Sequence, residues 1–529
     1  MEEGDALAAY ARALAADSFG AQRQAIAGYA AALDLAPDNE VLAARALEEA
    51  LAAGDQPLAV RAAKVLEARN KLGPDARLVL LADAVRRKDW RAAGLNADRM
   101  AEDRVFVFTA PLLHAWIAVG TGKGDPVAPI VAAARDPLAT AYGAEQRPLL
   151  LIAAGRTKEG LAALAPLIEG KEPRAERLRL AAAALLARKK ARKDALALLP
   201  EDQPSFARAR SLIARGKPLI EGDLAAWGIS SFLVRIAADL RGQEVPALAF
   251  NLARIATFAA PRNSEAWLAT AEMLAGRGQN EAALAALAQV PADDLLGQAA
   301  MDRRLSLLVE NGNAESALAD ARAAAEAQPN SPAAWTRLAD LFAKLEQHRE
   351  AADAYGKALQ AIAAGAESDT PEWALWLLSG AELSRAGDWE RGKTALQRAY
   401  TLAPQQPVVL NHLGYSQLER RENLDEAERL IREASKLDPD SAAITDSLGW
   451  ALYVRGDYSR AIELLERAAK GEPADSAINE HLGDAYYSAG RRYEARYAWQ
   501  AALIYAEAEA AERLRAKILR GLHPELAAP

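Results

Sequence analysis

Three carboxylates near the end of the sequence, Asp446, Glu480 and Asp484, stand close to aromatic residues and could bind a partner. Glu480 and Asp484 are four residues apart, so they share one face if the segment is helical. Carboxylates beside aromatic rings can hold a basic or apolar-basic segment through charge pairing and ring contact. The alternative interpretation is that these acids only solvate an exposed helix face.

The known catalytic patterns are not met. The run GTGKG at 120–124 lacks the upstream glycine and the preceding strand of a phosphate-binding loop, so we interpret it as a helix connection. The five histidines do not cluster with carboxylates at metal-site spacing, and cysteine is absent. The sequence therefore predicts a protein that is not an enzyme, with no cofactor and no metal.

The composition narrows the class of protein. A chain of 529 residues exceeds the roughly 250–300 residues at which one hydrophobic core stops growing, so we expect several domains or a repeat array. The formal net charge is −8, whereas nucleic-acid binding needs a basic stripe. We therefore expect no nucleic-acid partner.

The sequence also bears on location. Its longest charge-free run, Val105 to Gly122, contains Pro111 and falls short of the ~20 apolar residues of a membrane span. The first ten residues, MEEGDALAAY, do not resemble an export signal. We expect a cytoplasmic protein without a membrane span, or a periplasmic or envelope-associated one if an export leader has been trimmed.

A period of 34 residues organises the C-terminal third. Gly449 and Gly483 are 34 residues apart, and so are Ala461 and Ala495. In each unit a leucine–glycine pair is followed by alanine, a large residue, a second alanine and a proline. Small residues let two helices approach closely, and proline ends the second helix. Each unit is therefore predicted to be a pair of helices.

This pattern resembles the tetratricopeptide repeat (TPR), most clearly over residues 235–506. The resemblance implies an all-α fold, an α-solenoid superhelix of tandem TPR-like helix pairs, with about 13–15 pairs expected from length over period. It also implies a scaffold that binds other proteins. The C-terminal units are similar to those of bacterial repeat proteins that assist assembly at the cell envelope.

The expected organisation follows from where the period is clear and where it blurs. We expect N-terminal TPR-like repeats over 1–104, degenerate helical repeats with a bend over 105–228, TPR repeats over 229–360, a longer connection over 361–371, regular TPR repeats over 372–506, and a capping helix and tail over 507–529. The last helix, expected from Ala501 to Leu522, is interpreted as a solvated cap, with a separate docking helix as the alternative.

Helical geometry then selects the residues that face the concave surface. Positions three before and one after each repeat glycine point inward together. The partner-binding residues expected at these positions are Asn411, Tyr415, Asp446, Trp450, Glu480 and Asp484, and Tyr453 and Tyr487 are expected to flank the same groove. In the TPR family, a carboxylate clamp of basic residues at such positions holds chain termini. Acids stand here instead, so binding of Hsp90 or Hsp70 tails is not expected.

The sequence therefore favours a non-enzymatic TPR scaffold or adaptor that binds a polypeptide partner, in particular a basic or apolar segment, within a bacterial multiprotein assembly. Two alternatives stay open. One is an obligate subunit of a cell-envelope assembly or secretion machine. The other is an enzyme or transferase accessory with a helical-repeat body, whose chemistry would lie in the irregular stretch 105–205.

Overall fold

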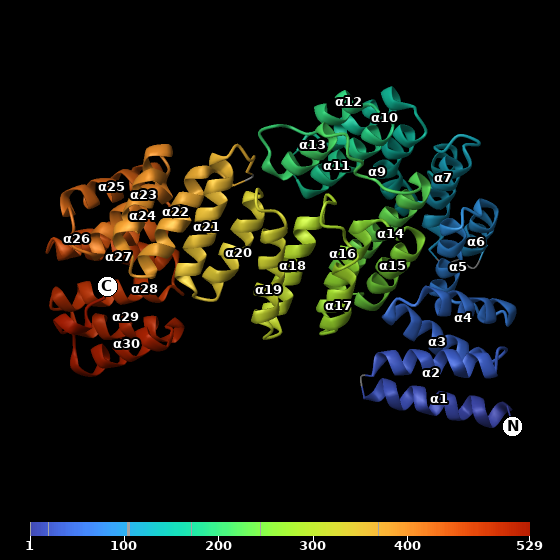
Figure 1. Ribbon diagram of the computed structural model, residues 1–529, viewed down its shortest axis with the longest axis horizontal. Coiled ribbons are helices and arrows are strands. Elements are labelled where there is room, and N and C mark those ends of the chain that lie inside the picture. The colour runs from blue at the N-terminus through green and yellow to red at the C-terminus, as the bar shows by residue number, and fades with distance from the viewer. Residues whose placement is uncertain are drawn as a thin grey trace. The chain divides into compact units, whose positions relative to one another are not determined.

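The structure is a computed structural model that describes residues 2–19, 21–102, 106–170, 172–243, 245–368 and 370–528. Within these ranges the chain forms 30 α-helices, four short 3-10 helices and no strand (Figure 1). It divides into two compact units, Met1–Asn313 and Ala314–Pro529, called the N-terminal and C-terminal units below. The prediction of an all-α fold is confirmed, and each unit is a stack of helix pairs.

The N-terminal unit contains the first 18 α-helices. They are α1 (Glu2–Ser18), α2 (Gln22–Leu35), α3 (Glu40–Ala53), α4 (Gln56–Ala68), α5 (Pro74–Arg86), α6 (Trp90–Glu102), α7 (Ala110–Thr121), α8 (Ala128–Ala132), α9 (Pro137–Ala153), α10 (Thr157–Leu164), α11 (Pro173–Arg188), α12 (Arg192–Ala197), α13 (Ala207–Ala214), α14 (Leu224–Gly242), α15 (Pro246–Ala259), α16 (Ser264–Ala275), α17 (Asn280–Leu287) and α18 (Gly297–Glu310). The short 3-10 helices η1 (Val107–Thr109), η2 (Ala165–Leu167) and η3 (Pro204–Phe206) lie between them.

The C-terminal unit is more regular. Its helices are α19 (Ala314–Ala327), α20 (Pro332–Lys344), α21 (His348–Ala363), α22 (Glu372–Arg385), α23 (Trp389–Leu402), α24 (Pro407–Glu419), α25 (Leu424–Leu437), α26 (Ala442–Val454), α27 (Tyr458–Gly471), α28 (Ser476–Ser488), α29 (Arg492–Tyr505) and α30 (Ala508–Arg520), followed by η4 (Pro524–Leu526). From α20 to α29, five successive antiparallel pairs pack against one another.

Local sequence signals fix where each helix of these pairs begins and ends. Asp475 caps α28 because its side chain accepts a hydrogen bond from the backbone N–H of Ile478. Gly456 and Gly490 adopt φ of +81° and +82° in the turn inside their pairs, a conformation that glycine adopts at little cost. Pro473 stands two residues beyond the end of α27, as the period predicts.

The repeat glycines lie where two helices meet. A methyl group on Gly449 would come within 2.8 Å of Leu465 Cγ, and one on Gly483 within 2.3 Å of Trp499 Cδ1. The first helices also contact one another from pair to pair, since α24 touches α26 and α26 touches α28. These three helices therefore form a continuous inner face, which carries the candidate site.

The irregular stretch 105–228 mixes long and short helices, because α9 and α11 have 17 and 16 residues whereas α8, α10, α12 and α13 have only five to eight each. The expected boundary at 228/229 falls inside α14, and the boundary at 104/105 lies outside the described residues. GTGKG at 120–124 spans the end of α7 and the following loop, in agreement with its interpretation as a connection. The predicted segment 229–360 contributes to both units.

Two expected element boundaries differ in the C-terminal unit. The connection predicted over 361–371 is shorter at its start, because α21 continues to Ala363. The single helix expected from Ala501 to Leu522 is wrong, because α29 ends at Tyr505 and α30 begins at Ala508. The break lets α30 fold back onto α29 and continue the stack.

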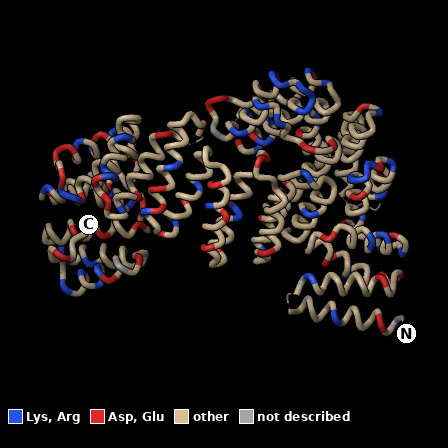
Figure 2. Tube along the Cα trace, in the orientation of Figure 1, with Lys and Arg blue, Asp and Glu red and all other residues tan. Residues whose placement is uncertain are grey.

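Charge is mixed along the chain. Figure 2 shows Lys and Arg interspersed with Asp and Glu over both units. One exposed turn between α11 and α12, residues 188–193, carries Arg188, Lys189, Lys190, Arg192 and Lys193. The expectation of no nucleic-acid partner thus rests on the net charge of the whole chain, not on a uniformly acidic surface.

Candidate functional site

The eight predicted partner-binding residues lie on the three inner helices of the C-terminal unit. We call them the C-terminal groove. Asn411 and Tyr415 are on α24, Asp446, Trp450 and Tyr453 on α26, and Glu480, Asp484 and Tyr487 on α28. Asp446, Trp450, Glu480 and Asp484 are buried, whereas the other four are half-buried.

The carboxylates of the groove are paired within the chain. Both carboxylate oxygens of Asp446 lie 3.0 Å from Nδ1 of His481. Glu480 accepts two hydrogen bonds of 2.8 Å from Arg513 and one of 2.6 Å from Lys517. The strip of acids that predicted a basic partner is thus neutralised by an adjacent repeat histidine and by α30.

The buried end of this network is Asp484. Both of its oxygens accept hydrogen bonds of 2.8 Å from Lys517 Nζ, and Oδ1 also accepts one of 2.9 Å from Trp499 Nε1. A charge taken out of water is tolerated only when it is paired and hydrogen-bonded. Lys517 has no exposed side-chain surface, so it differs from the solvated cap expected of the last helix.

Aromatic rings stack in the middle of the groove. Trp450 lies between Tyr453, at a ring-centroid distance of 4.4 Å, and His481, at 4.1 Å, with all three rings nearly parallel. Tyr415 lies 6.5 Å from the His481 ring. Trp450 is only 3% exposed, so it serves as the floor of the groove and not as a free anchor.

The chain's own C-terminal residues occupy part of the groove. We call residues 521–528 the tail. Gly521, with φ +87°, turns the chain next to Tyr487, whose hydroxyl leaves no room for a side chain there. The backbone N–H of Ala528 then donates a 2.9 Å hydrogen bond to Asp484 Oδ2, and its methyl group packs in the apolar cluster of Trp450 and Leu418. The tail therefore covers Asp484 and Trp450.

Two of the groove's titratable groups are shifted by their neighbours. Burial alone would lower the pKa of His481, but the charge and hydrogen bond of Asp446 outweigh it and raise that pKa above its ordinary value. For Asp484, burial raises the pKa more than Lys517 lowers it. Asp446 therefore favours the protonated, charged form of His481 in the floor of the groove.

The helix geometry brings together most of the predicted residues. Asp446, Trp450, Glu480, Asp484 and their flanking tyrosines form one connected network. Asn411 is set apart from that network, since its buried Oδ1 accepts no hydrogen bond from any described residue.

The partners of the acids were missed in the sequence, although the period points to them. Arg513 and Lys517 stand 33 residues after Glu480 and Asp484, nearly one repeat later. They therefore occupy in α30 the same inner positions that the acids occupy in α28.

Among the described residues, no group of three or more His, Asp or Glu side chains is arranged to hold a metal ion. In the same part of the chain, no helix has both the length and the apolar character required to traverse a bilayer.

Comparisons with known proteins agree with the helix pairs. A profile of the tetratricopeptide repeat matches residues 303–367, 377–442 and 447–514. A TPR repeat-containing protein of Pseudomonas aeruginosa is 32% identical over 109 residues, which are 21% of this chain and 18% of that protein. The chain thus spans less than a fifth of the length of this curated relative.

Solved structures with a similar fold include several TPR proteins. Yeast Tom70 is 14% identical with a TM-score of 0.36, over 100% of this chain and 99% of that one. A tetratricopeptide repeat protein from Parabacteroides merdae is 13% identical with a TM-score of 0.39, over 48% and 97%. These likenesses concern the fold alone. The 34-residue period, the helix pairs and the matched profile together identify tetratricopeptide repeats within residues 303–514 of this chain.

Proposed function

We propose that this protein is a non-enzymatic scaffold that binds an extended, apolar segment of another polypeptide in the C-terminal groove. TPR folds typically serve protein–protein interaction, and the solved neighbour YrrB is described as a TPR protein with an unusual peptide-binding site. The observation that supports the proposal is the tail. Its backbone N–H on Asp484 and its methyl group beside Trp450 are the kinds of contact that a bound peptide makes.

The internal pairing of the acids changes the expected chemistry of the partner. The sequence favoured a basic or apolar segment, because Asp446, Glu480 and Asp484 seemed to need positive charge. His481 and Lys517 already supply that charge from within the chain. A basic group of a partner would therefore meet carboxylates that are already paired. We therefore expect an apolar segment and not a basic one.

Ala528 is the tail's contact with Asp484 and Trp450. It donates one hydrogen bond to a carboxylate, worth about 1.5–3 kcal/mol, and buries one methyl group, worth about 0.8 kcal/mol. The preceding residues His523, Pro524 and Glu525 are exposed. A partner that places a larger apolar side chain beside Trp450 would gain more contact than Ala528 and displace it.

The wider roles suggested by the sequence remain alternatives under this proposal. Membership of a bacterial multiprotein assembly, an obligate place in a cell-envelope or secretion machine, and a role as an accessory to an enzyme or transferase each require a bound polypeptide. A cytoplasmic, periplasmic or envelope location is compatible with the groove, since its contacts depend on no compartment. The proposal therefore concerns the binding surface, and the partner's identity would select among these roles.

Photocrosslinking with the full chain in its native cells tests the proposal. A photoreactive phenylalanine at Tyr453 reports on the groove, and one at Tyr493, which is 80% exposed on α29, is the control. Ala528→Asp places a second carboxylate beside Asp484 and should release the tail, whereas His523→Asp adds the same charge at an exposed position of the tail.

We expect the Tyr453 position to crosslink a second polypeptide, in higher yield with Ala528→Asp and unchanged yield with His523→Asp. The Tyr493 position should not enrich that polypeptide. Equal crosslinking from the Tyr453 and Tyr493 positions would show that partners bind elsewhere. The same conclusion would follow if Ala528→Asp did not change the crosslinking yield at Tyr453.

A further inference from the structure

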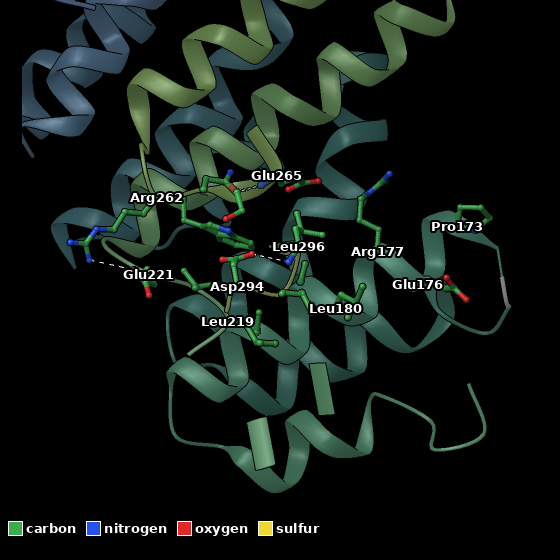
Figure 3. Close-up of a pocket in the computed structure, with 17 residues that line it drawn as sticks. Pro173, Glu176, Arg177, Leu180, Leu219, Glu221, Arg262, Glu265, Asp294 and Leu296 are labelled. Carbon is green, nitrogen blue, oxygen red and sulfur yellow. Dashed lines mark hydrogen bonds and ion pairs between the residues drawn. The ribbon is translucent and has the colours of Figure 1, made fainter. Parts of the chain in front are cut away.

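A second candidate site lies within the N-terminal unit and shares no residue with the C-terminal groove. It is a pocket of about 340 Å³, within the range of roughly 300–1,000 Å³ that small-molecule sites occupy. Segments far apart in the sequence line it: α11, the start of α14 and of α16, and the connections before α14 and α18. Figure 3 shows Asp294 and Leu296 between Arg262 at one end and Glu176 at the other.

The walls of the pocket are apolar. Leu180 from α11, Leu219 and Ile220 from the connection before α14, and Trp227 from α14 face Leu296 of the connection before α18. Of these, only Ile220 is fully buried, and the others keep part of their surface open to the pocket. An apolar group that entered would remove this surface from water and gain its transfer free energy.

The polar groups at the pocket are mainly carboxylic acids. Glu176, Glu221, Glu265 and Asp294 line it, against two arginines. Both arginines already have acidic partners, since Arg262 lies 3.5 Å from Glu221 and Arg177 lies 3.2 Å from Glu145. Glu265 and Asp294 have weaker compensation: Ser231 bonds to Glu265 and Arg177 acts on it from farther away, while the backbone N–H of Leu296 donates a 2.8 Å hydrogen bond to Asp294 and Arg208 acts on it from farther away. The pocket thus has an excess of negative charge.

The wall that carries Asp294 is held in place by the rest of the unit. Arg208 donates hydrogen bonds of 2.7 and 3.0 Å to the backbone carbonyl of Asp294 and one of 3.1 Å to that of Ala292. Lys217 pairs with Asp293 at 3.0 Å. Gly297 is required where α18 begins, because a methyl group there would lie 2.5 Å from the carbonyl oxygens of Pro291 and Ala292. The Asp294 carboxyl is therefore positioned before any ligand arrives.

We infer that this pocket binds an apolar group that carries a positive charge, an organic ammonium whose apolar body packs on Trp227 and Leu296 and whose charge meets Asp294 and Glu265. An anionic ligand would be repelled by the same acids, and an uncharged one would leave them without a counter-charge.

The protonation behaviour of the two acids supports this assignment. Burial raises the pKa of Glu265 and that of Asp294 above their ordinary values, so each carboxylate is costly in the empty pocket. A bound ammonium group would offset that cost. The ligand charge would also lie close to the Trp227 face, where a cation is attracted to the ring.

The same chemistry has two sources, a free amine or a lysine side chain flanked by apolar residues in a partner. Calorimetric titration of the full chain separates them. The probes are 2-phenylethylamine for the free source and acetyl-Leu-Lys-amide for the peptide source, and uncharged 2-phenylethanol is the reference. We expect a charged probe to bind about tenfold more tightly than the alcohol, the value of one hydrogen bond to a charged group.

Two variants place the binding in the pocket. Asp294→Asn should weaken the charged probe about tenfold, while Asp202→Asn, which removes an equal charge at an exposed position outside the pocket, should leave the affinity unchanged. Ala181→Leu fills the space from α11 without touching a charge and should abolish binding, with unchanged helicity as the check on folding.

Saturable binding of the amine alone would assign a small-molecule site, and binding of the peptide probe alone would assign an anchor for a partner side chain. The inference is overturned if neither probe saturates at millimolar concentration, if the alcohol binds as tightly as the ammonium probes, or if both aspartate variants weaken binding equally. None of these results depends on the C-terminal groove.

Discussion

Lys517 Nζ lies 2.8 Å from each carboxylate oxygen of Asp484, and neither side chain has any exposed surface. The two residues belong to α30 and α28, and Lys517 also bonds to Glu480. Removing one member of a buried pair leaves an uncompensated charge, whereas an intact pair contributes little compared with apolar residues. The main effect of the pair is therefore to fix the position at which α30 packs on α28.

The first prediction follows from this buried ion pair. Lys517→Met keeps the apolar stem but leaves Asp484 and Glu480 without their buried cation, so it should lower the free energy of unfolding of the C-terminal unit by about 3–5 kcal/mol. Urea denaturation followed by circular dichroism measures the change. Adding Asp484→Asn should recover part of the loss. A double variant as unstable as the sum of its single variants would show that the two residues do not interact.

The second prediction compares two glycines in the same unit. An alanine at Gly483 would press its methyl group against Trp499, which is fully buried, and should destabilise the unit by about 1–3 kcal/mol. An alanine at Gly356 meets no atom within 4 Å in the middle of α21, so it should stabilise by about 0.5–1 kcal/mol. Thermal melting decides between them. Equal effects of the two substitutions would refute the close approach of α28 and α29.

The third prediction concerns two histidines at equivalent repeat positions. Burial, with Arg385, lowers the pKa of His412, whereas Asp446, helped by the nearby acids, raises that of His481 against burial. NMR titration of the ring protons should therefore give a midpoint below 6.5 for His412 and above 6.5 for His481.

The stability effect of His481 has a definite sign. Because folding raises the pKa of His481, protonated His481 stabilises the folded chain, and this stabilisation is fully present below the pKa of the unfolded chain, about 6.5. It is lost as the pH rises through the pKa of His481 in the folded chain. Asp446→Asn should remove the elevation of the His481 midpoint and leave His412 unchanged. A normal His481 midpoint in the wild type would contradict the pair.

The fourth prediction replaces one that the sequence alone favours. The combined change Asp446→Lys and Glu480→Lys would be tolerated if these acids were solvated on an open face, with melting nearly unchanged. In the structure Asp446 pairs with the buried His481, and Glu480 pairs with Arg513 and Lys517. The lysine at 446 would therefore be buried without a counter-charge, and the lysine at 480 would meet two positive charges. We expect the melting temperature to drop and α30 to detach, measured by calorimetry and by proteolysis after Arg513. Wild-type melting would restore the solvated interpretation.

The fold could be predicted because the residues that pack against one another in each repeat recur at fixed spacings in the sequence. Gly449 and Gly483 recur at one period with a large residue sixteen positions later, and Leu465 and Trp499 at those positions are the residues they contact. Between 105 and 228 long helices such as α9 and α11 alternate with helices of only five to eight residues, so the spacing between equivalent positions changes and the period is lost.

The candidate site could be predicted only in part, because helical geometry gives the direction of a side chain but not what covers it. The i and i+4 rule brought Asp446 and Trp450, and Glu480 and Asp484, to one inner face. The charged sequence of α30 suggested solvation, and the break at residues 506–507 hid its register. Lys517 is buried because two carboxylates compensate its charge, and no composition rule anticipates such a pair.

The charge pairs between successive repeats affect how the unit comes apart. A linear array normally frays from its last helix, because that helix has a neighbour on one side only. Here, loss of α30 would expose Glu480 and Asp484 in a cavity shaped for Lys517, so opening at this end carries an extra electrostatic cost. Local unfolding of α30 alone is thereby disfavoured. The last two helix pairs, α26–α27 and α28–α29, should unfold together with their neighbours in one cooperative step.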